Sequence, residues 1–208
     1  MSGLTDGRRF PGPGPVRLSG EGLLLREWAP EDVERMTELF DDPQISRWTP
    51  LASPFDRAAA QAYVERAELR RADGSALQLA IEEQGAGLPL GEVLLFGHPD
   101  VAEVGWAVGA AHRGRRVASR AVRLLLGWAG PTWRIERFRA LIEPGNDASE
   151  RVAVAAGFTR VGGPLVEVES RGRRVGLAAW QRDGVPARGA PRPSADGAGM
   201  AGRPASSG

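Results

Sequence analysis

The chain has 208 residues, of which 42% are hydrophobic, and its formal net charge is +1 at pH 7. A chain of this length and composition can bury a sizeable core, and its balanced charge argues against a nucleic-acid-binding protein. Cysteine is absent and His98 and His112 are the two histidines, which excludes disulfides, thiolate metal sites, a cysteine nucleophile and a histidine-based metal cluster. We therefore expect no metal site.

The two ends of the chain differ in composition from the middle. Residues 1–21 carry a Gly-Pro repeat and little apolar surface, and residues 184–208 consist largely of Gly, Pro, Ala and Ser with scattered Arg. Because neither segment can offset its loss of chain entropy on folding, both are predicted as disordered tails around one domain, residues 22–183. No apolar run approaches the ~20 residues that cross a bilayer, and no secretory signal is present, so we expect no membrane contact and a cytoplasmic location.

Strands and helices alternate between the tails. Period-2 alternation predicts strands, Pro and acidic residues mark helix starts, and Asn and Gly mark caps. In chain order, we expect a strand at 23–26, helices at 30–40 and 53–71, a hairpin of strands at 76–81 and 90–96, a strand at 101–108, a helix from Val117, a strand at 137–142, a helix opened by Asn146, and strands at 158–161 and 175–181. Residues 42–50 are expected to form a loop. This order predicts an α/β protein whose mixed sheet has helices on both faces.

The junction at residues 102–126 is the most informative segment. Along the strand, Glu103 lies on a face of small residues that leaves space, and the following loop is dense in Gly and Arg. The first-turn N–H groups of the next helix have no intrahelical partner, and the helix dipole places partial positive charge there. The junction is therefore suited to bind phosphates, although a lone basic loop would more simply be a solvated connection.

Motifs further along the chain favour the interpretation of this junction as a phosphate-binding site. The segment Arg113-Gly114-Arg115-Arg116-Val117-Ala118, the step Asn146-Asp147-Ala148-Ser149 and the closing Ala156-Gly157-Phe158 together resemble the GNAT acetyltransferases, and closely their RimJ/RimL-type branch. The resemblance extends from about Leu23 to about Gln181. It implies a central, mostly antiparallel mixed sheet of about seven strands and acetyl-CoA as the acyl donor.

In that family the loop reads (Gln/Arg)-x-x-Gly-x-(Gly/Ala), and its backbone amides hold the pyrophosphate of acetyl-CoA. Arg116 stands where the family has the inner glycine, so its side chain either blocks the phosphates or pairs with one of them. We favour retained binding, because the position opens a helix and we expect a right-handed backbone there. The resemblance implies that the cofactor-binding residues are Trp106, Ala107, Val108, Arg113, Gly114, Arg115, Arg116, Val117, Ala118, Ser119 and Asn146.

Acetyl transfer to an amine needs a base, an oxyanion donor and an acid for the leaving thiolate. Glu103 is the candidate base, since the matching strand position carries a proposed base in several relatives. Its alternative is a solvated or strand-edge charge. The family places the oxyanion donor at a backbone N–H at or beside Val108.

Many GNAT enzymes use a Tyr seven residues after the Asn as the leaving-group acid, but Ala153 occupies that position here. The RimJ/RimL-type pattern instead implies Ser149, whose hydroxyl can donate to the sulfur. Alternatively, Ser149 bonds local backbone at the helix start. Asn146 either only caps its helix or also contacts the pantetheine arm.

The tryptophans divide into two groups. Trp48 falls in the 42–50 segment, which borders the acceptor site in GNAT folds, so it is a candidate substrate-binding residue or a packing anchor. The others that lie in predicted elements are expected in the core; they are Trp28, Trp106, Trp128 and Trp180.

The sequence thus predicts an acetyl-CoA-dependent N-acetyltransferase that works in a ternary complex without metal. Its acceptor would be an amine, either a protein N-terminus or a small molecule, and both monomer and homodimer remain open. The alternative is a non-catalytic acyl-CoA-binding sensor, since Arg116 replaces the loop glycine and no Tyr acid is present. A nucleic-acid-binding role through the arginine-rich loop is a further alternative, against which the balanced net charge argues.

Overall fold

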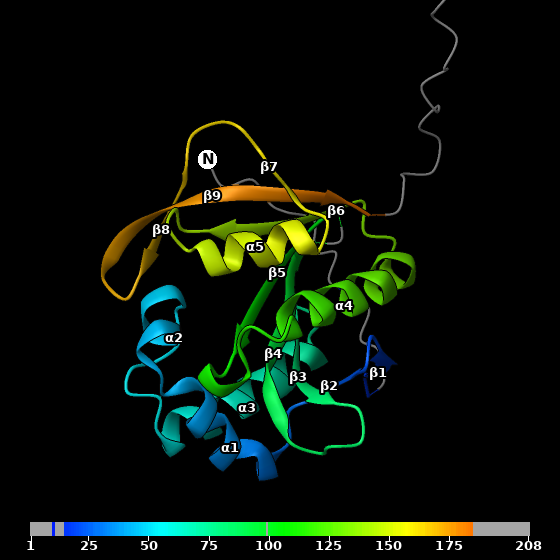
Figure 1. The fold of residues 1–208 in the computed structure, drawn as a ribbon, viewed down its shortest axis with the longest axis vertical. Helices are drawn as coiled ribbons and strands as arrows, with labels where there is room; N and C mark the ends of the chain where they lie inside the picture. Colours follow the sequence, from blue (N-terminus) through cyan, green and yellow to red (C-terminus); the bar gives the residue numbers. More distant parts are fainter. Residues whose placement is uncertain (1–9, 11–14, 99, 185–208) are drawn as a thin grey trace, which may run out of the picture.

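The computed structural model describes residues 10, 15–98 and 100–184 (Figure 1). Its sheet has nine strands, eight of which follow the order β1-β2-β3-β4-β5-β6-β9-β7, with β8 pairing to β9. Every neighbouring pair is antiparallel except β5 and β6. The strands are β1 Arg17–Gly20, β2 Leu23–Glu27, β3 Ala76–Glu83, β4 Pro89–His98, β5 Val101–Val108, β6 Arg137–Ile142, β7 Thr159–Arg160, β8 Val166–Ser170 and β9 Arg173–Asp183.

Helices cover both faces of this sheet, as predicted. The helices α4 and α5 lie on the near face in Figure 1, where α4 buries Val117, Ala121 and Leu125 in the larger core cluster. On the other face, α1 and α3 enclose a second cluster that contains Phe40, Phe55 and Tyr63. The helices are α1 Val33–Phe40, α2 Pro43–Trp48, α3 Arg57–Ala72, α4 Val117–Trp133 and α5 Asp147–Ala155, with 3-10 turns η1 Pro30–Asp32 and η2 Ala110–His112.

The sequence-based prediction of a loop at residues 42–50 was wrong, because α2 forms there. The side chain of Asp42 accepts hydrogen bonds from the backbone N–H groups of Gln44 and Ile45, and Pro43 occupies the first helical position. Both features start helices. Ile45 is buried, which anchors α2 against the second core cluster.

The predicted N-terminal tail, residues 1–21, includes residues that belong to the folded domain. Residues 17–20 form β1, which pairs with β2, and Phe10 is 3% exposed with its ring centroid 4.9 Å from that of Trp133. These apolar contacts offset the ordering of the segment. The predicted C-terminal tail lies outside the described residues except for Gly184.

The tryptophans expected in the core are buried to different degrees. Trp28 and Trp180 are buried, whereas Trp106 and Trp128 are half-buried and pack against the edge of the larger cluster. Among the described residues, no helix has the length and apolar character needed to span a bilayer.

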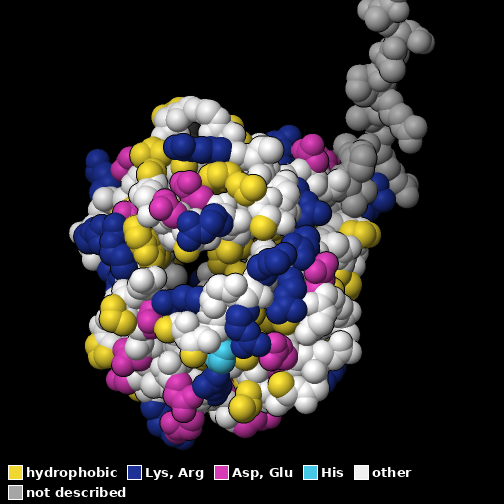
Figure 2. All heavy atoms as spheres, viewed as in Figure 1, with side chains coloured by type: hydrophobic (Ala, Val, Ile, Leu, Met, Phe, Trp, Pro, Cys, Tyr) yellow, Lys and Arg dark blue, Asp and Glu magenta, His cyan; other side chains and the backbone are white. Residues whose placement is uncertain are grey.

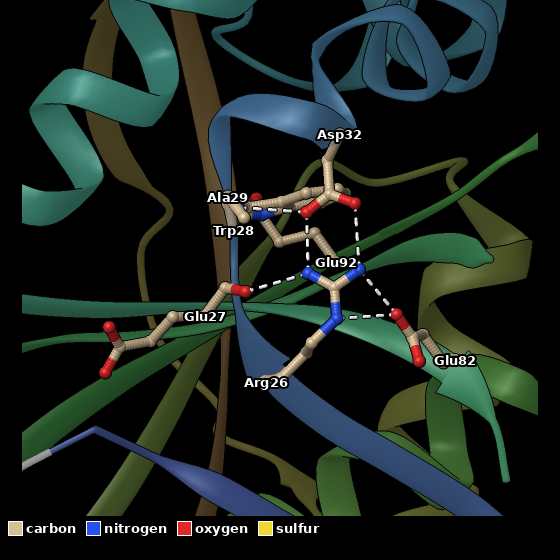
Figure 3. Close-up of polar contacts among 7 residues, drawn as sticks. All are labelled: Arg26, Glu27, Trp28, Ala29, Asp32, Glu82 and Glu92. Carbon is tan, nitrogen blue, oxygen red and sulfur yellow. Dashed lines mark hydrogen bonds and ion pairs between the residues drawn. The ribbon is translucent and has the colours of Figure 1, made fainter. Parts of the chain in front are cut away.

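A buried ionic network joins the first helical segment to the sheet (Figure 3). Nη1 and Nη2 of Arg26 donate to the two carboxylate oxygens of Asp32 at 2.6 and 2.8 Å, and Nε donates to Glu82 Oε1 at 2.6 Å. Asp32 and Glu82 are 5% and 3% exposed. The hydrogen bonds to Asp32 raise the pKa of Arg26, so the guanidinium stays charged and compensates both carboxylates.

A third buried carboxylate, Glu92 on β4, forms no ion pair with any cation of the described residues. It accepts hydrogen bonds from Trp28 Nε1 at 2.8 Å and from the Tyr63 hydroxyl at 2.7 and 2.8 Å. Desolvation raises the pKa of Glu92 to about 7, although both hydrogen bonds act in the opposite direction. The residue lies opposite Ala107 in the β4–β5 register, and so supports the strand that forms the candidate site.

The strands β5 and β6 separate after a short stretch of pairing. Their parallel register covers only Val101, Ala102 and Glu103 of β5, so residues 104–108 have no neighbouring strand on that side within the described part of the chain. An unpaired strand edge presents free N–H and C=O groups. The separation therefore opens the sheet beside α4 and positions the site described next.

Candidate active site

A cavity of about 610 Å³ lies where β5 parts from β6. Four segments enclose it: one side of α2, the end of β5, the loop that leads into α4 with the first turn of that helix, and one face of α5. Its lining residues are Gln44, Ile45, Trp48, Thr49, Trp106, Ala107, Val108, His112, Arg113, Gly114, Arg116, Val117, Ala118, Ser119, Asn146, Ala148, Ser149, Arg151, Val152 and Ala155. Figure 2 shows that this face of the molecule is hollowed.

The first turn of α4 presents backbone N–H groups to the cavity that have no hydrogen-bond acceptor within the helix. The N–H of Arg120 donates to the Arg116 carbonyl at 3.1 Å, which begins the α-helical ladder. The N–H groups of Val117, Ala118 and Ser119 precede that bond in the first turn, and these residues line the cavity. They are donors for an anion, as expected from the sequence.

The backbone of Arg116 differs from the prediction. We expected a right-handed conformation, but Arg116 has φ 57° and ψ 21° and precedes the first helical residue. The chain must reverse direction between the loop and α4, and a left-handed residue at this position makes that turn. For a residue other than glycine this conformation costs roughly 1–2 kcal/mol, which explains the advantage of glycine at the position. The Arg116 side chain is exposed and lines the cavity.

The neighbouring arginines have different partners. Nη2 of Arg113 donates to Asp42 Oδ1 at 2.7 Å, and its Nε donates to the Val108 carbonyl at 3.1 Å. Arg113 thus ties the loop to α2 and to the end of β5. Arg115 pairs with Glu83 and does not line the cavity, so its charge is compensated outside the lining.

The end of β5 supplies a donor that points into the opened sheet. The N–H of Gly109 donates to the Leu90 carbonyl at 3.0 Å, on the β4 side. Because successive residues of a strand alternate sides, the N–H and C=O of Val108 point away from β4. The bond from Arg113 to the Val108 carbonyl agrees with this direction. The Val108 N–H therefore faces the cavity that its residue lines.

The start of α5 contributes two polar side chains. Oδ1 of Asn146 accepts the N–H of Ser149 at 3.1 Å, which confirms that Asn146 caps the helix. Its Nδ2 has no partner among residues that the structure describes, and neither does the Ser149 hydroxyl. Both residues line the cavity, so each keeps a free donor for a ligand.

His112 also lines the cavity and is held neutral. Its Nε2 accepts a hydrogen bond from Arg35 Nη2 at 2.8 Å. Burial lowers the pKa of His112, and the nearby charges of Arg35 and Arg115 lower it further.

Glu103 lies at the point where β5 and β6 separate, but not in the cavity lining. Its Oε1 accepts from Arg139 Nη2 at 2.8 Å. This ion pair ties β5 to β6 at the point where the two strands separate.

Trp48 ends α2 and lines the cavity, and the Arg47 guanidinium lies 4.1 Å from the centre of its ring. The structure therefore brings together every candidate site residue except Glu103 and Arg115. In the described part of the chain, no group of His, Cys, Asp and Glu is arranged to hold a metal ion.

Comparison with known proteins agrees with this geometry. Residues 22–159 match the family model described as "Acetyltransferase (GNAT) domain". The chain belongs to the GNAT acetyltransferase family. It is also 23% identical over 148 residues to a Bacillus licheniformis protein named "Uncharacterized N-acetyltransferase p20", which covers 70% of this chain and 83% of that protein.

Solved structures of GNAT proteins share the fold. Mycobacterium smegmatis RimJ, in complex with CoA-disulfide, has a TM-score of 0.68 and 20% identity, covering 82% of this chain and 86% of that one. The microcin C7 self-immunity acetyltransferase MccE, in complex with acetyl-CoA and AMP, has a TM-score of 0.69 and 21% identity, covering 79% and 93%. These likenesses confirm the mixed sheet flanked by helices.

Sequence reasoning missed part of the lining of this GNAT cavity. On α5 it named Ser149 but not the rest of the face at helical spacing, which is Ala148, Arg151, Val152 and Ala155. On α2 it missed Gln44, Ile45 and Thr49. The Asp42-Pro43 helix start was the available signal for α2, and helical periodicity from Ser149 was the signal for α5.

Proposed function

We propose that this GNAT protein is an acetyl-CoA-dependent N-acetyltransferase in which an amine attacks the thioester directly within a ternary complex. One observation carries the proposal: the opened edge of β5, with the Val108 N–H, lies in the same cavity as the unpaired first-turn N–H groups of α4. The first feature suits a thioester carbonyl and the second suits a diphosphate.

The residues present fit acetyl-CoA as a substrate. The first-turn amides of α4 and the exposed Arg116 supply donors and charge for the diphosphate. The free edge at residues 104–108 can pair with the amide groups of the pantetheine arm, and the free Asn146 Nδ2 can donate to a carbonyl of that arm.

The chemistry then follows from the donors around the thioester. The amine nitrogen forms a bond to the thioester carbon, and the carbonyl oxygen gains negative charge that the Val108 N–H stabilises. The carbon–sulfur bond breaks, and the thiolate takes a proton from the Ser149 hydroxyl, directly or through water. The amine loses one proton to a base, and that proton returns through solvent to Ser149, so the products are an amide and coenzyme A.

Glu103 remains our proposed base, acting through water, because it lies where the opened sheet begins. Its Oε1 also accepts a hydrogen bond from Arg139 Nη2. A Glu103→Gln variant should lower kcat and leave the affinity for acetyl-CoA nearly unchanged. An unchanged kcat would mean that the amine proton leaves to solvent without Glu103.

The acceptor end lies beside Trp48, and the acceptor that we propose is a primary amine of a protein N-terminus or of a small molecule. An enzyme that consumes acetyl-CoA works where acetyl-CoA is supplied, so we propose a cytoplasmic location. Both monomer and homodimer are compatible with a site that one chain forms alone.

Thermal melting with acetyl-CoA tests the coenzyme site. A ligand at about 100 times its dissociation constant adds ~2.7 kcal/mol, which raises Tm by roughly 5–10 °C for a domain of this size. S-acetylpantetheine lacks the nucleotide diphosphate and is the matched control, for which we expect a much smaller shift. Equal shifts for the two ligands, or none, would contradict a diphosphate site at α4.

Acetyl transfer is tested by thiol release with a panel of amines and N-terminal peptides. Release that depends on the acceptor, with an acetylated product seen by mass spectrometry, supports the enzyme. A melting shift without transfer to any acceptor would instead support the acyl-CoA sensor.

A further inference from the structure

A second cavity, of about 540 Å³, adjoins the acetyl-CoA cavity on its acceptor side. Trp48 and Thr49 line both, so the two spaces meet at the end of α2. The opposite wall is the hairpin of β8 and β9, which Figure 1 shows facing α2. The lining is Arg47, Trp48, Thr49, Pro50, Glu143, Val168, Glu169, Ser170, Arg171, Arg173, Val175 and Leu177.

The hairpin register determines which side chains face this cavity. Val168 lies opposite Val175, and Ser170 lies opposite Arg173. Cross-strand pairs share a face of the hairpin, so Arg173 is on the same face as the half-buried Val168 and Val175. Glu169 and Arg174 form the next pair, whose positions alternate to the outer face, although the Glu169 side chain also lines the cavity. Arg173 is therefore the charged residue of the inner face.

Of the other charged groups of this wall, Arg47 and Glu143 are the ones that form an ion pair within the described residues. Arg47 donates to both carboxylate oxygens of Glu143, at 2.9 and 2.7 Å. Glu169 lies opposite Arg174 in the register. Arg171 donates to the Ser46 hydroxyl at 3.0 Å, which leaves its charge uncompensated.

Arg173 has no hydrogen bond or ion pair with any residue that the structure describes. Its charge nevertheless acts on the cavity side, because it contributes to lowering the pKa of Glu143 there, after the larger effect of Arg47. Figure 2 shows arginine side chains gathered over the tip of this hairpin.

From this arrangement we infer that the second cavity binds an anionic group of the acceptor, so that the enzyme prefers amines that also carry a carboxylate or a phosphate. The anionic group contacts Arg173, with Arg171 beside it, while the amine lies past Trp48 at the thioester. Val168, Val175 and Leu177 supply an apolar floor between the two ends. This inference rests on the proposed acetyltransferase function and narrows its acceptor class.

The charges that line the second cavity disfavour a cationic acceptor. A polycationic acceptor would need several uncompensated carboxylates, whereas the lining has two, Glu143 and Glu169, and Glu143 already holds the Arg47 fork. Bidentate pairing of this kind satisfies both partners and leaves little for a ligand. A guanidinium without a partner, in contrast, offers its donors directly to a carboxylate or phosphate.

Acceptors matched in all but charge test the inference. The peptide arm uses one N-terminal residue followed by two Glu, two Gln or two Lys residues. The small-molecule arm compares O-phosphoethanolamine with ethanolamine, and β-alanine with β-alaninamide. We expect kcat/KM to be about tenfold higher for the anionic member of at least one arm, and the preference to shrink at high salt. The arm that shows it identifies the source of the anion.

Variants then locate the effect. Arg173→Glu should abolish the preference for the anionic acceptor, mainly through KM, and leave kcat/KM for the neutral acceptor and the KM for acetyl-CoA within about twofold. Arg174→Glu is the matched control, since its side chain belongs to the outer face of the same hairpin. We expect it to retain the preference.

The possible outcomes distinguish a failure of this inference from a failure of the proposed acetyltransferase function. Transfer to anionic and neutral acceptors at equal rates would overturn the anionic preference and leave the acetyltransferase intact. An equal loss in Arg173→Glu and Arg174→Glu would also overturn it, because a general surface charge would then be responsible. Transfer to no acceptor would overturn the proposed function and this inference together.

Discussion

The buried carboxylate of Glu92 should make this protein less stable as the pH rises from about 4.5 to about 7. In the folded protein the pKa of Glu92 is about 7, against an ordinary value of 4.5. Between these values the folded chain holds a proton that the unfolded chain has released, so raising the pH favours unfolding. Other carboxylates also change the free energy of unfolding as the pH changes. A variant that differs only at Glu92 therefore isolates the contribution of this residue.

Glu92→Gln is that variant. It keeps the shape and an acceptor for Trp28 Nε1 or the Tyr63 hydroxyl, but it cannot ionise. A difference of 2.5 pKa units at ~1.36 kcal/mol per unit gives about 3 kcal/mol above pH 7. The free energy of unfolding of the variant, minus that of the parent, should therefore rise by about 2 to 3 kcal/mol between pH 5 and pH 8.

Urea unfolding followed by circular dichroism at pH 5, 6, 7 and 8 measures this difference. Glu65→Gln, an exposed position of α3, is the matched control and should leave the pH dependence unchanged. A difference for Glu92→Gln that stays flat within about 0.5 kcal/mol, or that falls with pH, would refute the reasoning. The carboxylate would then be solvated or paired with a cation in solution.

Three further substitutions test other features. Arg26→Met should lower the free energy of unfolding by about 3 kcal/mol in a urea titration at pH 7, because two buried carboxylates lose their cation. Arg116→Gly should leave Tm within about 3 °C by calorimetry, because relief of the left-handed backbone is offset by the greater freedom of the unfolded chain, whereas Arg116→Val should lower Tm. Ser149→Ala should reduce kcat by about 100-fold with little change in the KM for acetyl-CoA, measured by thiol release.

Each of these expectations has a clear contrary result. An Arg26→Met protein as stable as the parent would mean that Asp32 and Glu82 do not depend on the guanidinium. A Tm for Arg116→Val equal to that of the parent would contradict the left-handed backbone. A full kcat in Ser149→Ala would show that the thiolate leaves without a serine proton.

The elements of secondary structure follow from local patterns, and most were predictable. Asn146 caps α5, Val117 begins α4, and the alternation at residues 101–108 gives a strand, because capping and periodicity involve residues close in the sequence. The start of α2 was also predictable from Asp42-Pro43, but the helix is too short to show a clear helical period. By contrast, β1 and β8 are short strands, and whether they form depends on the strands with which they pair.

The sequence by itself determined the order of elements, the helix starts and the basic loop that indicate a GNAT acetyltransferase. Only the tertiary structure decided the separation of β5 from β6, the left-handed turn at Arg116, and the ion pairs that join Arg115 to Glu83 and Glu103 to Arg139. It alone also formed the second cavity between α2 and the β8–β9 hairpin. The physical reason is distance along the chain: caps and periodicity act over a few residues, whereas these features depend on which distant segments pack together.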